Sequence, residues 1–551
     1  MTIPNLQRSE QSFPTLTPAQ IARIASHGRS RAVKQGEILG EAGTKIDKFF
    51  VVTKGSIDAV RQSEEGESTV TTLKEGQFSG EVTMLSGRRA LVTLRAAEPG
   101  EVIEVDREDL VSLVQLDAEL SEILMRAFLL RRAALIAGGL GDVLLVGSSH
   151  SSDTLRIKEF LTRNGHPYST MDPDTDPDIQ DLLDRFQFSI EEIPVLICRG
   201  RTVLRNPTNR KIADCLGFND AIDQEDVREV VIVGGGPAGL SAAVYAASEG
   251  LKVLVLEANV PGGQAGSSSW IENYLGFPAG ISGQDLTARA YTQALKFGAD
   301  VVIAERATRI DCAVQPYAIE IDKGKKLSAK TVIIATGAQY RKLPVENMTR
   351  FENAGVYYGA TFIEAQLCAG EDVVVVGGGN SAGQAAVFLS QTAKKVFMLV
   401  RSAGLKETMS EYLVRRIEES GNIVVQARTE ITSVEGDEHL QRVTWATRDK
   451  GSESHDIRHV FVMTGATPTT KWLEGCLVMD SRGFIKTGQD LTASDLRAAG
   501  WPLERAPYLL ETSRPGVFAV GDVRANNIKR VASAVGEGPI SVSFVHRVLA
   551  E

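Results

Sequence analysis

Two glycine-rich segments of this chain have a spacing that can bind the phosphates of a dinucleotide. The first follows the apolar run 230–233 and places glycines at Gly234, Gly236 and Gly239. In this pattern the first glycine makes a tight turn, the second lets the backbone approach a pyrophosphate, and the third lets the following helix pack on the strand. The helix N-terminus offers free N–H groups to the phosphates. The segment therefore predicts a strand, a turn and a helix that hold a dinucleotide.

An acidic residue strengthens this interpretation. A second apolar run, 253–256, ends in Glu257, about twenty positions past the glycines. A carboxylate at this place accepts a hydrogen bond from the ribose 2′-hydroxyl of the nucleotide. Pro237 and Ala238 open the helix between the second and third glycines. The alternative is a glycine-rich turn that binds nothing, and Glu257 at this spacing argues against it.

The second segment of this type follows the apolar run 373–376. Its members are Gly377, Gly379, Asn380, Ser381 and Ala382. Here the next predicted strand, 395–400, ends in Arg401 instead of a carboxylate, and Lys406 follows closely. Cations suit the 2′-phosphate of NADPH, and only arginine can bind phosphate through two hydrogen bonds. We expect a preference for NADPH that depends mainly on Arg401; the alternative is that both cations are solvated surface residues.

The arrangement of these motifs resembles a known family. One dinucleotide fold interrupts another, and a late strand ends in Gly521 and Asp522, as in the pyridine nucleotide-disulfide oxidoreductases. The Gly-Gly-Gln segment at 262–264 and the Glu-Asn-Tyr-x-Gly segment at 272–276 are similar to low-molecular-weight thioredoxin reductase. The resemblance covers about 228–551.

The resemblance implies two Rossmann-like α/β domains and a homodimer. An FAD-binding domain would comprise 228–342 and 470–551, and an NADPH-binding domain, 345–468, would be inserted into it. FAD would contact Gly234, Gly236, Pro237, Ala238, Gly239, Glu257, Gly262, Gln264, Asn273, Thr336, Gly337, Gly521, Asp522 and the 529–531 segment with Arg530 and Val531. NADPH would contact Gly377, Gly379, Asn380, Ser381, Ala382, Arg401, Lys406 and Gly465.

The cysteine pair whose disulfide accepts electrons in that family is missing. The resemblance places Cys-Ala-Thr-Cys just before the second glycine segment, where this chain has Gly359, Ala360, Thr361 and Phe362. Gly359 and Phe362 cannot take electrons from a reduced flavin. The next cysteine, Cys368, stands alone, and we expect it to be a small buried apolar side chain. No catalytic acid or base stands out, because hydride transfer between nicotinamide and flavin depends on how the cofactors are positioned.

The sequence thus predicts an FAD-dependent NADPH oxidoreductase that reduces an acceptor other than thioredoxin: a quinone, oxygen, a redox protein or an organic substrate. Two alternatives stay open. One is a true thioredoxin-disulfide reductase that uses unpaired cysteines. The other is a ligand-sensing flavoprotein with little turnover, regulated through its N-terminal domain.

Residues 1–137 are predicted to form a β-roll that ends in a long helix over 118–136. Thr17 and Pro18 mark the start of an earlier helix, and short strands separated by glycine follow at 33–39, 49–55, 69–73 and 91–94. Residues 78–90 resemble the phosphate cassette of a cyclic-nucleotide-binding domain, although the cassette is shorter than that family's usual one. By this resemblance a cyclic nucleotide would meet Gly80, Glu81, Arg88 and Arg89. The alternative is a β-roll that docks without a ligand.

Residues 140–220 are predicted to form a small α/β domain that resembles thioredoxin or glutaredoxin. Strands at 142–147 and 193–197 flank a helix at 154–164, and Pro194 opens the later strand. The redox motif of that family would fall near 149–152, which reads Ser-His-Ser-Ser. Without a thiolate there is no dithiol exchange, so we expect a domain without redox activity. An ordinary small α/β domain is the alternative.

Composition narrows the functional class. At 551 residues the chain is too long for one core, and its net charge of −10 argues against nucleic-acid binding. No apolar run is long enough for a membrane span, and the N-terminus lacks the pattern of a secretory signal. The five cysteines are isolated and the seven histidines are scattered. We therefore expect no metal site, no disulfide framework and a reduced, cytoplasmic protein.

Overall fold

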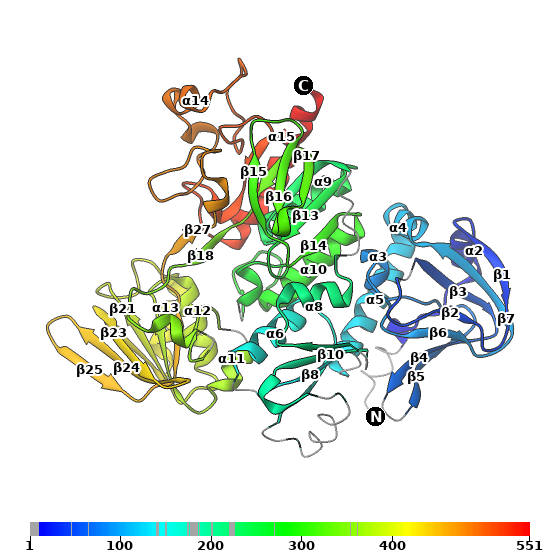
Figure 1. Ribbon diagram of the computed structural model, residues 1–551, viewed down its shortest axis with the longest axis horizontal. Helices are drawn as coiled ribbons and strands as arrows, with labels where there is room; N and C mark the ends of the chain where they lie inside the picture. Colours follow the sequence, from blue (N-terminus) through cyan, green and yellow to red (C-terminus); the bar gives the residue numbers. More distant parts are fainter. Residues whose placement is uncertain are drawn as a thin grey trace. The chain divides into compact units, whose positions relative to one another are not determined.

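The chain divides into two compact units in a computed structural model (Figure 1). The first comprises Met1–Ser148, Gly165–Asp223 and Thr292–Ala304, and the second comprises Ser149–Asn164, Gln224–Tyr291 and Glu305–Glu551. The structure describes residues 10–45, 47–63, 66–138, 143–148, 151–173, 176, 186, 188–199, 202–219, 226–268, 270–352, 354–360 and 362–551.

The N-terminal part of the first unit is β-rich. Its strands form the sheets β1-β7-β3 and β2-β6-β4-β5. Their bounds are β1 Gly28–Val33, β2 Ile38–Gly40, β3 Lys48–Lys54, β4 Ile57–Ser63, β5 Gly66–Leu73, β6 Thr93–Ala96 and β7 Gly100–Asp106. The helices are α2 Pro18–Ala25, α3 Thr83–Ser86, α4 Arg107–Leu116 and α5 Ala118–Ala137. The rings of Phe49, Phe78 and Phe128 pack on one another and join β3 to α5 in the core.

The helix predictions for this part are confirmed, and two strand predictions need correction. Thr17 caps α2 in a capping box with Gln20, and α5 runs almost exactly as long as expected from 118–136. The predicted strand 33–39 is two short strands, because the Lys34 N–H donates to Glu37 Oε2 at 3.0 Å in a turn between them. The strand expected at 91–94 begins only at Thr93.

A four-stranded sheet of order β11-β10-β8-β9 completes the described sheets of the first unit. β8 is parallel to β9, whereas β10 is antiparallel to both β8 and β11. The bounds are β8 Val143–Val146, β9 Ser169–Met171, β10 Val195–Cys198 and β11 Thr202–Arg205, with α8 at Asn209–Leu216 and β14 at Asp300–Ile303. The Ile193–Pro194 peptide bond is cis. Residues 149 and 150 of the expected redox motif lie outside the described residues.

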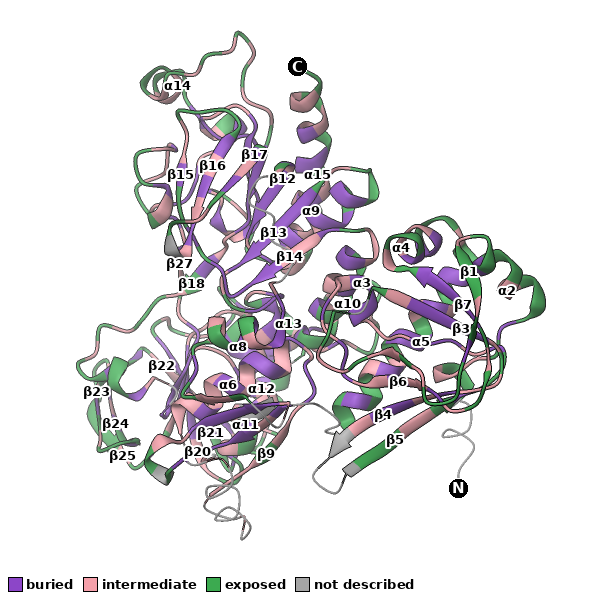
Figure 2. Cartoon of the chain, turned by 45° about the vertical axis from the view of Figure 1, so that its right-hand side comes forward, coloured by how far each residue is buried: buried purple, intermediate pink, exposed green. Residues whose placement is uncertain are grey.

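The second unit contains a largely buried sheet around β12 (Figure 2). β12 is parallel to β13 and β17, and β28 is parallel to β17, while β16 and β15 extend the sheet in antiparallel fashion. The strands are β12 Val227–Val233, β13 Val253–Glu257, β15 Ala307–Asp311, β16 Tyr317–Ile321, β17 Lys326–Ile334 and β28 Val517–Ala519. The helices are α6 Ser152–Arg163, α9 Pro237–Ser248, α10 Gly283–Lys296, α14 Ala493–Ala499 and α15 Val531–Ala550. α15 lies against α9, where Ser241 Oγ donates to the Val535 carbonyl at 2.8 Å.

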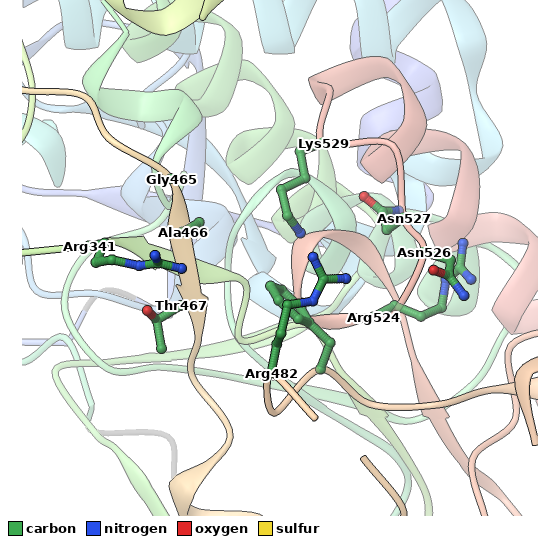
Figure 3. A pocket seen from close by; sticks show the side chains of 10 residues that line it. Arg341, Gly465, Ala466, Thr467, Arg482, Arg524, Asn526, Asn527 and Lys529 are labelled. Carbon is green, nitrogen blue, oxygen red and sulfur yellow. The ribbon is translucent and has the colours of Figure 1, made fainter. Parts of the chain in front are cut away.

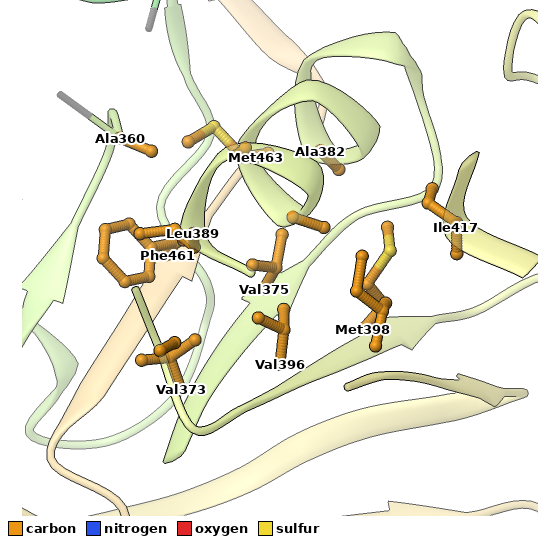
Figure 4. Close-up of a cluster of buried hydrophobic side chains, with 14 of the residues drawn as sticks. Ala360, Val373, Val375, Ala382, Leu389, Val396, Met398, Ile417, Phe461 and Met463 are labelled. Carbon is orange, nitrogen blue, oxygen red and sulfur yellow. The ribbon is translucent and has the colours of Figure 1, made fainter. Parts of the chain in front are cut away.

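Two hinge strands, β18 Ala338–Tyr340 and β27 Ala466–Pro468, pair with each other and lead into and out of the inserted part. Its parallel sheet has the order β19-β26-β20-β21-β22, and an antiparallel sheet β23-β24-β25 accompanies it. The bounds are β19 Val356–Tyr357, β20 Asp372–Val376, β21 Lys395–Val400, β22 Ile423–Ala427, β23 Thr429–Gly436, β24 Leu440–Thr447, β25 Gly451–His455, β26 His459–Val462, α11 Phe362–Leu367, α12 Asn380–Leu389 and α13 Glu411–Glu419. Valines of β20 and β21 pack against Leu389 of α12 and Ile417 of α13 in its core (Figure 4).

The expectation of a chain without disulfides needs correction. Cys312, just after β15, forms a disulfide with Cys476, and the two Cα atoms are 5.9 Å apart. The pairing escapes sequence reasoning because the two residues are 164 positions apart and carry no spacing motif. In the described part of the chain, every helix is too short or too polar to cross a membrane. Within the same residues, no cluster of His, Cys, Asp and Glu side chains is placed to hold a metal ion.

Candidate functional site: two dinucleotide cradles and the lost dithiol

The glycines after β12 lie as a phosphate cradle requires. Gly234 has φ 111°, and a Cβ atom there would be 2.3 Å from the Ala335 carbonyl oxygen, so only glycine fits. A Cβ on Gly239 would be 1.9 Å from the Gly234 oxygen, which shows how closely α9 packs on the turn. Gly236 faces open space instead, with Gly263 Cα at 3.9 Å as its nearest neighbour. Gly236 also caps α9 without a side-chain hydrogen bond, so the helix N-terminus is available to an anion.

Glu257 is placed at the end of β13, beside this turn. Its two carboxylate oxygens accept backbone N–H bonds from Gly235 and Asn259, each at 2.8 Å. Burial raises the pKa of Glu257, and these N–H donors and the charge of Arg163 oppose the rise. Each carboxylate oxygen can accept a further hydrogen bond, so the residue can still bind a ribose hydroxyl.

Arg163 is a contributor that the sequence did not indicate. It ends α6, and its Nη2 donates to the Gly263 carbonyl at 2.7 Å. The guanidinium therefore holds the 262–264 loop that faces Gly236. It lies about a hundred residues from that loop in sequence, and no local motif marks it.

Most of the other polar residues expected around FAD already have partners within the protein. Gly521 N–H donates to Glu537 Oε2 at 2.7 Å, and burial raises the pKa of Asp522, the next residue, in the short turn that follows β28. Gln264 Nε2 donates to the Ala338 carbonyl at the first hinge strand. Thr336 Oγ1 donates to the Thr469 carbonyl at 2.9 Å, so this threonine braces the hinge. The remaining members are Gly262 and Gly337, which have positive φ, Val531 at the start of α15, and Asn273 and Arg530, which are exposed.

The second cradle repeats this geometry after β20. Gly377 has φ 142°, and a Cβ atom there would be 2.5 Å from the Met463 carbonyl oxygen. Gly379 has no neighbour within 4 Å of its Cβ position and caps α12 without a side-chain bond. Ala382 is fully buried and lets α12 approach the sheet. The chain thus offers a second open helix N-terminus for phosphates.

Some polar residues of this second cradle hydrogen-bond within the protein, and others are exposed to solvent. Asn380 Oδ1 accepts the Ser410 N–H at 2.7 Å, and Thr408 Oγ1 donates to the Gly378 carbonyl at 2.7 Å. Both bonds fix the loop after β21 against the glycines, a role that the sequence did not indicate. Arg401 and Lys406 on that loop are exposed. Gly465 is exposed at the second hinge strand, where its carbonyl accepts the Arg341 N–H at 2.8 Å.

Gly359, at the first lost cysteine position, lies beside the 262–268 loop. A β-bridge joins Ala360 to Ser268, and a small cavity of about 30 Å³ lies among residues that include Gln264, Tyr340 and Ser381. Burial raises the pKa of Tyr340, whose hydroxyl hydrogen-bonds Ser381. Phe362 is the first residue of α11, and Thr361 lies outside the described residues. The place of the dithiol therefore adjoins both cradles.

Cys368 does not replace the missing thiols. It is fully buried, its Sγ donates to the Ala365 carbonyl at 3.7 Å, and burial raises its pKa to about 12. A thiol of that pKa stays protonated near neutral pH and is a poor nucleophile. The expectation of a buried apolar side chain is confirmed.

The residues of the N-terminal cassette have internal partners. Arg88 is buried, with its guanidinium 4.0 Å from the ring centroid of Phe218. Glu81 accepts a hydrogen bond from Thr83 and pairs with Arg132 Nη1 at 3.5 Å. Gly80 has φ 94°, and Arg89 forms a β-bridge with Lys45. A ligand here would have to compete with these contacts.

Comparison with known proteins agrees with this geometry. Residues 228–538 match the pyridine nucleotide-disulphide oxidoreductase family, and residues 30–117 match the cyclic nucleotide-binding domain family. The chain is 32% identical to an NADH dehydrogenase of Bacillus subtilis over 311 residues, which cover 56% of each protein. It therefore spans little more than half of that relative.

Two thioredoxin reductases are similar over nearly their whole length. The enzyme of Bacillus subtilis is 30% identical over 331 residues, which cover 60% of this chain and 97% of that enzyme. The crystal structure of the Lactococcus lactis enzyme in its FR conformation aligns with a TM-score of 0.52 at 27% identity and covers 59% of this chain and 99% of the enzyme. The chain has two open glycine cradles, and the family match covers more than half of its length. This match shows that the chain belongs to the pyridine nucleotide-disulphide oxidoreductase family.

Proposed function

We propose that this protein is an NADPH-dependent FAD oxidoreductase that delivers electrons to an acceptor other than thioredoxin. One observation carries the proposal: at Gly359, where the resemblance expects the first dithiol cysteine, a residue without a thiol lies beside Ser267 of the loop expected to hold the flavin. The chain keeps both cradles and has no Cys-x-x-Cys pair anywhere in its sequence. The candidate acceptors are a quinone, oxygen, a redox protein and an organic substrate.

The residues of the first cradle fit FAD. The open face of Gly236 and the uncapped start of α9 would take the pyrophosphate, Glu257 the ribose, and Asp522 the polyol chain. When bound, the flavin would accept a hydride from the nicotinamide and store two electrons. Gly379 and α12 would hold the NADPH pyrophosphate, and Arg401 with Lys406 would bind its 2′-phosphate. The protein's part is to position both rings, and the hinge strands β18 and β27 connect the two cradles.

Cys368, Cys312 and Cys476 are poorly suited to act as the thiols of a disulfide reductase. Cys368 is buried with a raised pKa, and Cys312 is already paired with Cys476. A reductase that uses unpaired cysteines is therefore the weaker alternative. A ligand-sensing flavoprotein with little turnover is the other, and the cyclic nucleotide-binding domain match at residues 30–117 favours it.

Anaerobic reduction of the bound flavin by NADPH, followed by an acceptor screen, separates these three functions. We expect rapid loss of flavin absorbance, rapid reoxidation by at least one of the candidate acceptors, and no reduction of thioredoxin. Thioredoxin reduction at rates typical of a reductase would establish the second function. A flavin that NADPH does not reduce would establish the third.

The proposal extends to the first unit and to assembly. The strand order β11-β10-β8-β9, with only β8 and β9 parallel, supports a thioredoxin-like fold for the middle part. The sequence at 149–152 has no cysteine, so this part would dock proteins without exchanging disulfides.

We propose that a small anion such as a cyclic nucleotide regulates turnover through the N-terminal part. Homodimerisation, expected by resemblance, is tested by light scattering of the FAD-loaded protein.

A further inference from the structure

A basic cavity lies beside the second hinge strand in the second unit. It has a volume of about 370 Å³, within the range of sites for small organic molecules. Arg341, Arg482, Arg524 and Lys529 line it together with Phe484, and none of its lining residues is acidic. Figure 3 shows that these basic side chains come from separate segments of the chain and surround one shared space.

The carboxylates near this cavity do not neutralise all four cations. Arg524 Nη2 donates to Glu537 Oε1 at 2.6 Å, and Arg482 Nη2 lies 3.5 Å from Asp480 Oδ2. Lys529 Nζ instead donates to the backbone carbonyl of Asp522 at 2.9 Å. Arg524 Nη1 also lies 3.9 Å from Asp490 Oδ2, and the Asp522 carboxylate acts on Lys529, so of the four cations only Arg341 lacks a carboxylate partner among the described residues.

Two further observations indicate a missing partner. Arg524 Nε is a buried donor without a hydrogen-bond partner, although buried polar atoms are normally satisfied. Lys529 Nζ lies 4.3 Å from the ring centroid of Phe484, and partial burial lowers the pKa of Lys529. A bound anion would stabilise the charged form of that ammonium.

We infer that this cavity binds a small ligand with a phosphate or carboxylate group and an aromatic or other apolar body that contacts Phe484. Guanidinium groups bind such anions through paired, charge-assisted hydrogen bonds. The four cradle glycines Gly234, Gly236, Gly377 and Gly379 are absent from the cavity lining, although Lys529 and Gly465 also belong to the residues expected to contact FAD and NADPH. The inference concerns binding alone and holds whichever acceptor the protein reduces.

Calorimetric titration of the FAD-saturated, NADPH-free protein with phenyl phosphate tests it, because the flavin then fills its own phosphate site. We expect one site per chain, with affinity above that for inorganic phosphate. Arg341→Ala and Arg482→Ala should each weaken binding about tenfold or more. Arg309→Ala, an exposed arginine on β15, is the matched control and should leave binding unchanged.

Phenyl phosphate could also enter the second cradle, so Arg401→Ala is titrated in parallel. Loss of binding in Arg401→Ala with retention in Arg341→Ala would overturn the inference, as would the absence of binding. Inhibition that competes with the electron acceptor would identify the ligand as a substrate, and an altered kcat at constant acceptor KM would identify an effector. Failure of NADPH to reduce the flavin would contradict the proposed function and leave the titration result intact.

Discussion

Gly359 lies directly beside Ser267: a Cβ atom built on Gly359 would be 3.4 Å from Ser267 Cβ. That separation is ordinary van der Waals contact, so the site of the lost dithiol has room for a side chain. Ser267 Oγ in turn donates to the Gln264 carbonyl at 2.9 Å, within the loop predicted to hold FAD. The segment where the dithiol is expected therefore lies in contact with the loop expected to hold FAD.

Restoring the dithiol should restore disulfide chemistry. We expect the double variant Gly359→Cys/Phe362→Cys to form a disulfide and to gain NADPH-dependent reduction of a small aromatic disulfide. The increase should be about tenfold or more over the wild type, because a disulfide beside the flavin accepts two electrons and the resulting dithiol passes them to the small disulfide by exchange. The single variants are the controls, since one thiol cannot complete the exchange. A double variant that forms the disulfide yet shows no gain would mean that the flavin is not presented to this position.

The two roles assigned to glycine in the first cradle can be separated by mutation. Gly239→Ala should lower the free energy of unfolding by about 2 kcal/mol or more, because its Cβ would meet the Gly234 oxygen at 1.9 Å. Gly236→Ala should leave the FAD-free protein as stable as the wild type, since its nearest neighbour is 3.9 Å away, but it should weaken FAD binding. Denaturant unfolding and flavin titration measure the two effects. Equal FAD affinity in Gly236→Ala and wild type would remove this cradle as the FAD site.

Arg401→Ala tests the cofactor preference. Arg401 is exposed directly after β21, in the place where the sequence predicts a contact with the 2′-phosphate. We expect kcat/KM for NADPH to fall about tenfold or more and kcat/KM for NADH to change little, because only NADPH carries that phosphate. Lys406→Ala should show a smaller effect of the same kind. A wild-type enzyme that prefers NADH would contradict the assignment, and the similarity to an NADH dehydrogenase makes this comparison informative.

The sequence predicted the cradles well because their requirements are local. The backbone at Gly234 has a positive φ, and the close packing at Gly239 leaves no room for a Cβ. Glycine meets both conditions, so the sequence shows them as glycines at a fixed spacing. Arg163 and the Cys312–Cys476 pair could not be predicted, because each depends on a contact between segments far apart in the chain. The basic cavity is of the same kind, since Arg341 and Lys529 belong to one site only after folding.

The Cys312–Cys476 disulfide should contribute to stability. It closes a span of 164 residues and so restricts the unfolded chain. We expect the double variant Cys312→Ser/Cys476→Ser to lose about 2–4 kcal/mol of unfolding free energy, and a reductant to destabilise the wild type but not the variant. Mass spectrometry of peptides prepared without reduction verifies the linkage. Two free thiols in the purified protein, with no effect of reductant, would contradict it.

Cys368 offers a test that depends on pH. Its folded-state pKa is raised to about 12, whereas the pKa of an unfolded cysteine is about 8.5. The group's contribution to stability is therefore complete below about pH 8.5 and is lost progressively as the pH rises towards 12. Between about pH 8 and 10 the free energy of unfolding of the wild type should fall by about 1–2 kcal/mol relative to that of Cys368→Ala, which has no thiol to titrate. Flavin reduction by NADPH should be the same in both proteins. Rapid alkylation of Cys368 in the folded protein near neutral pH would contradict its burial and would return the unpaired-cysteine reductase to consideration.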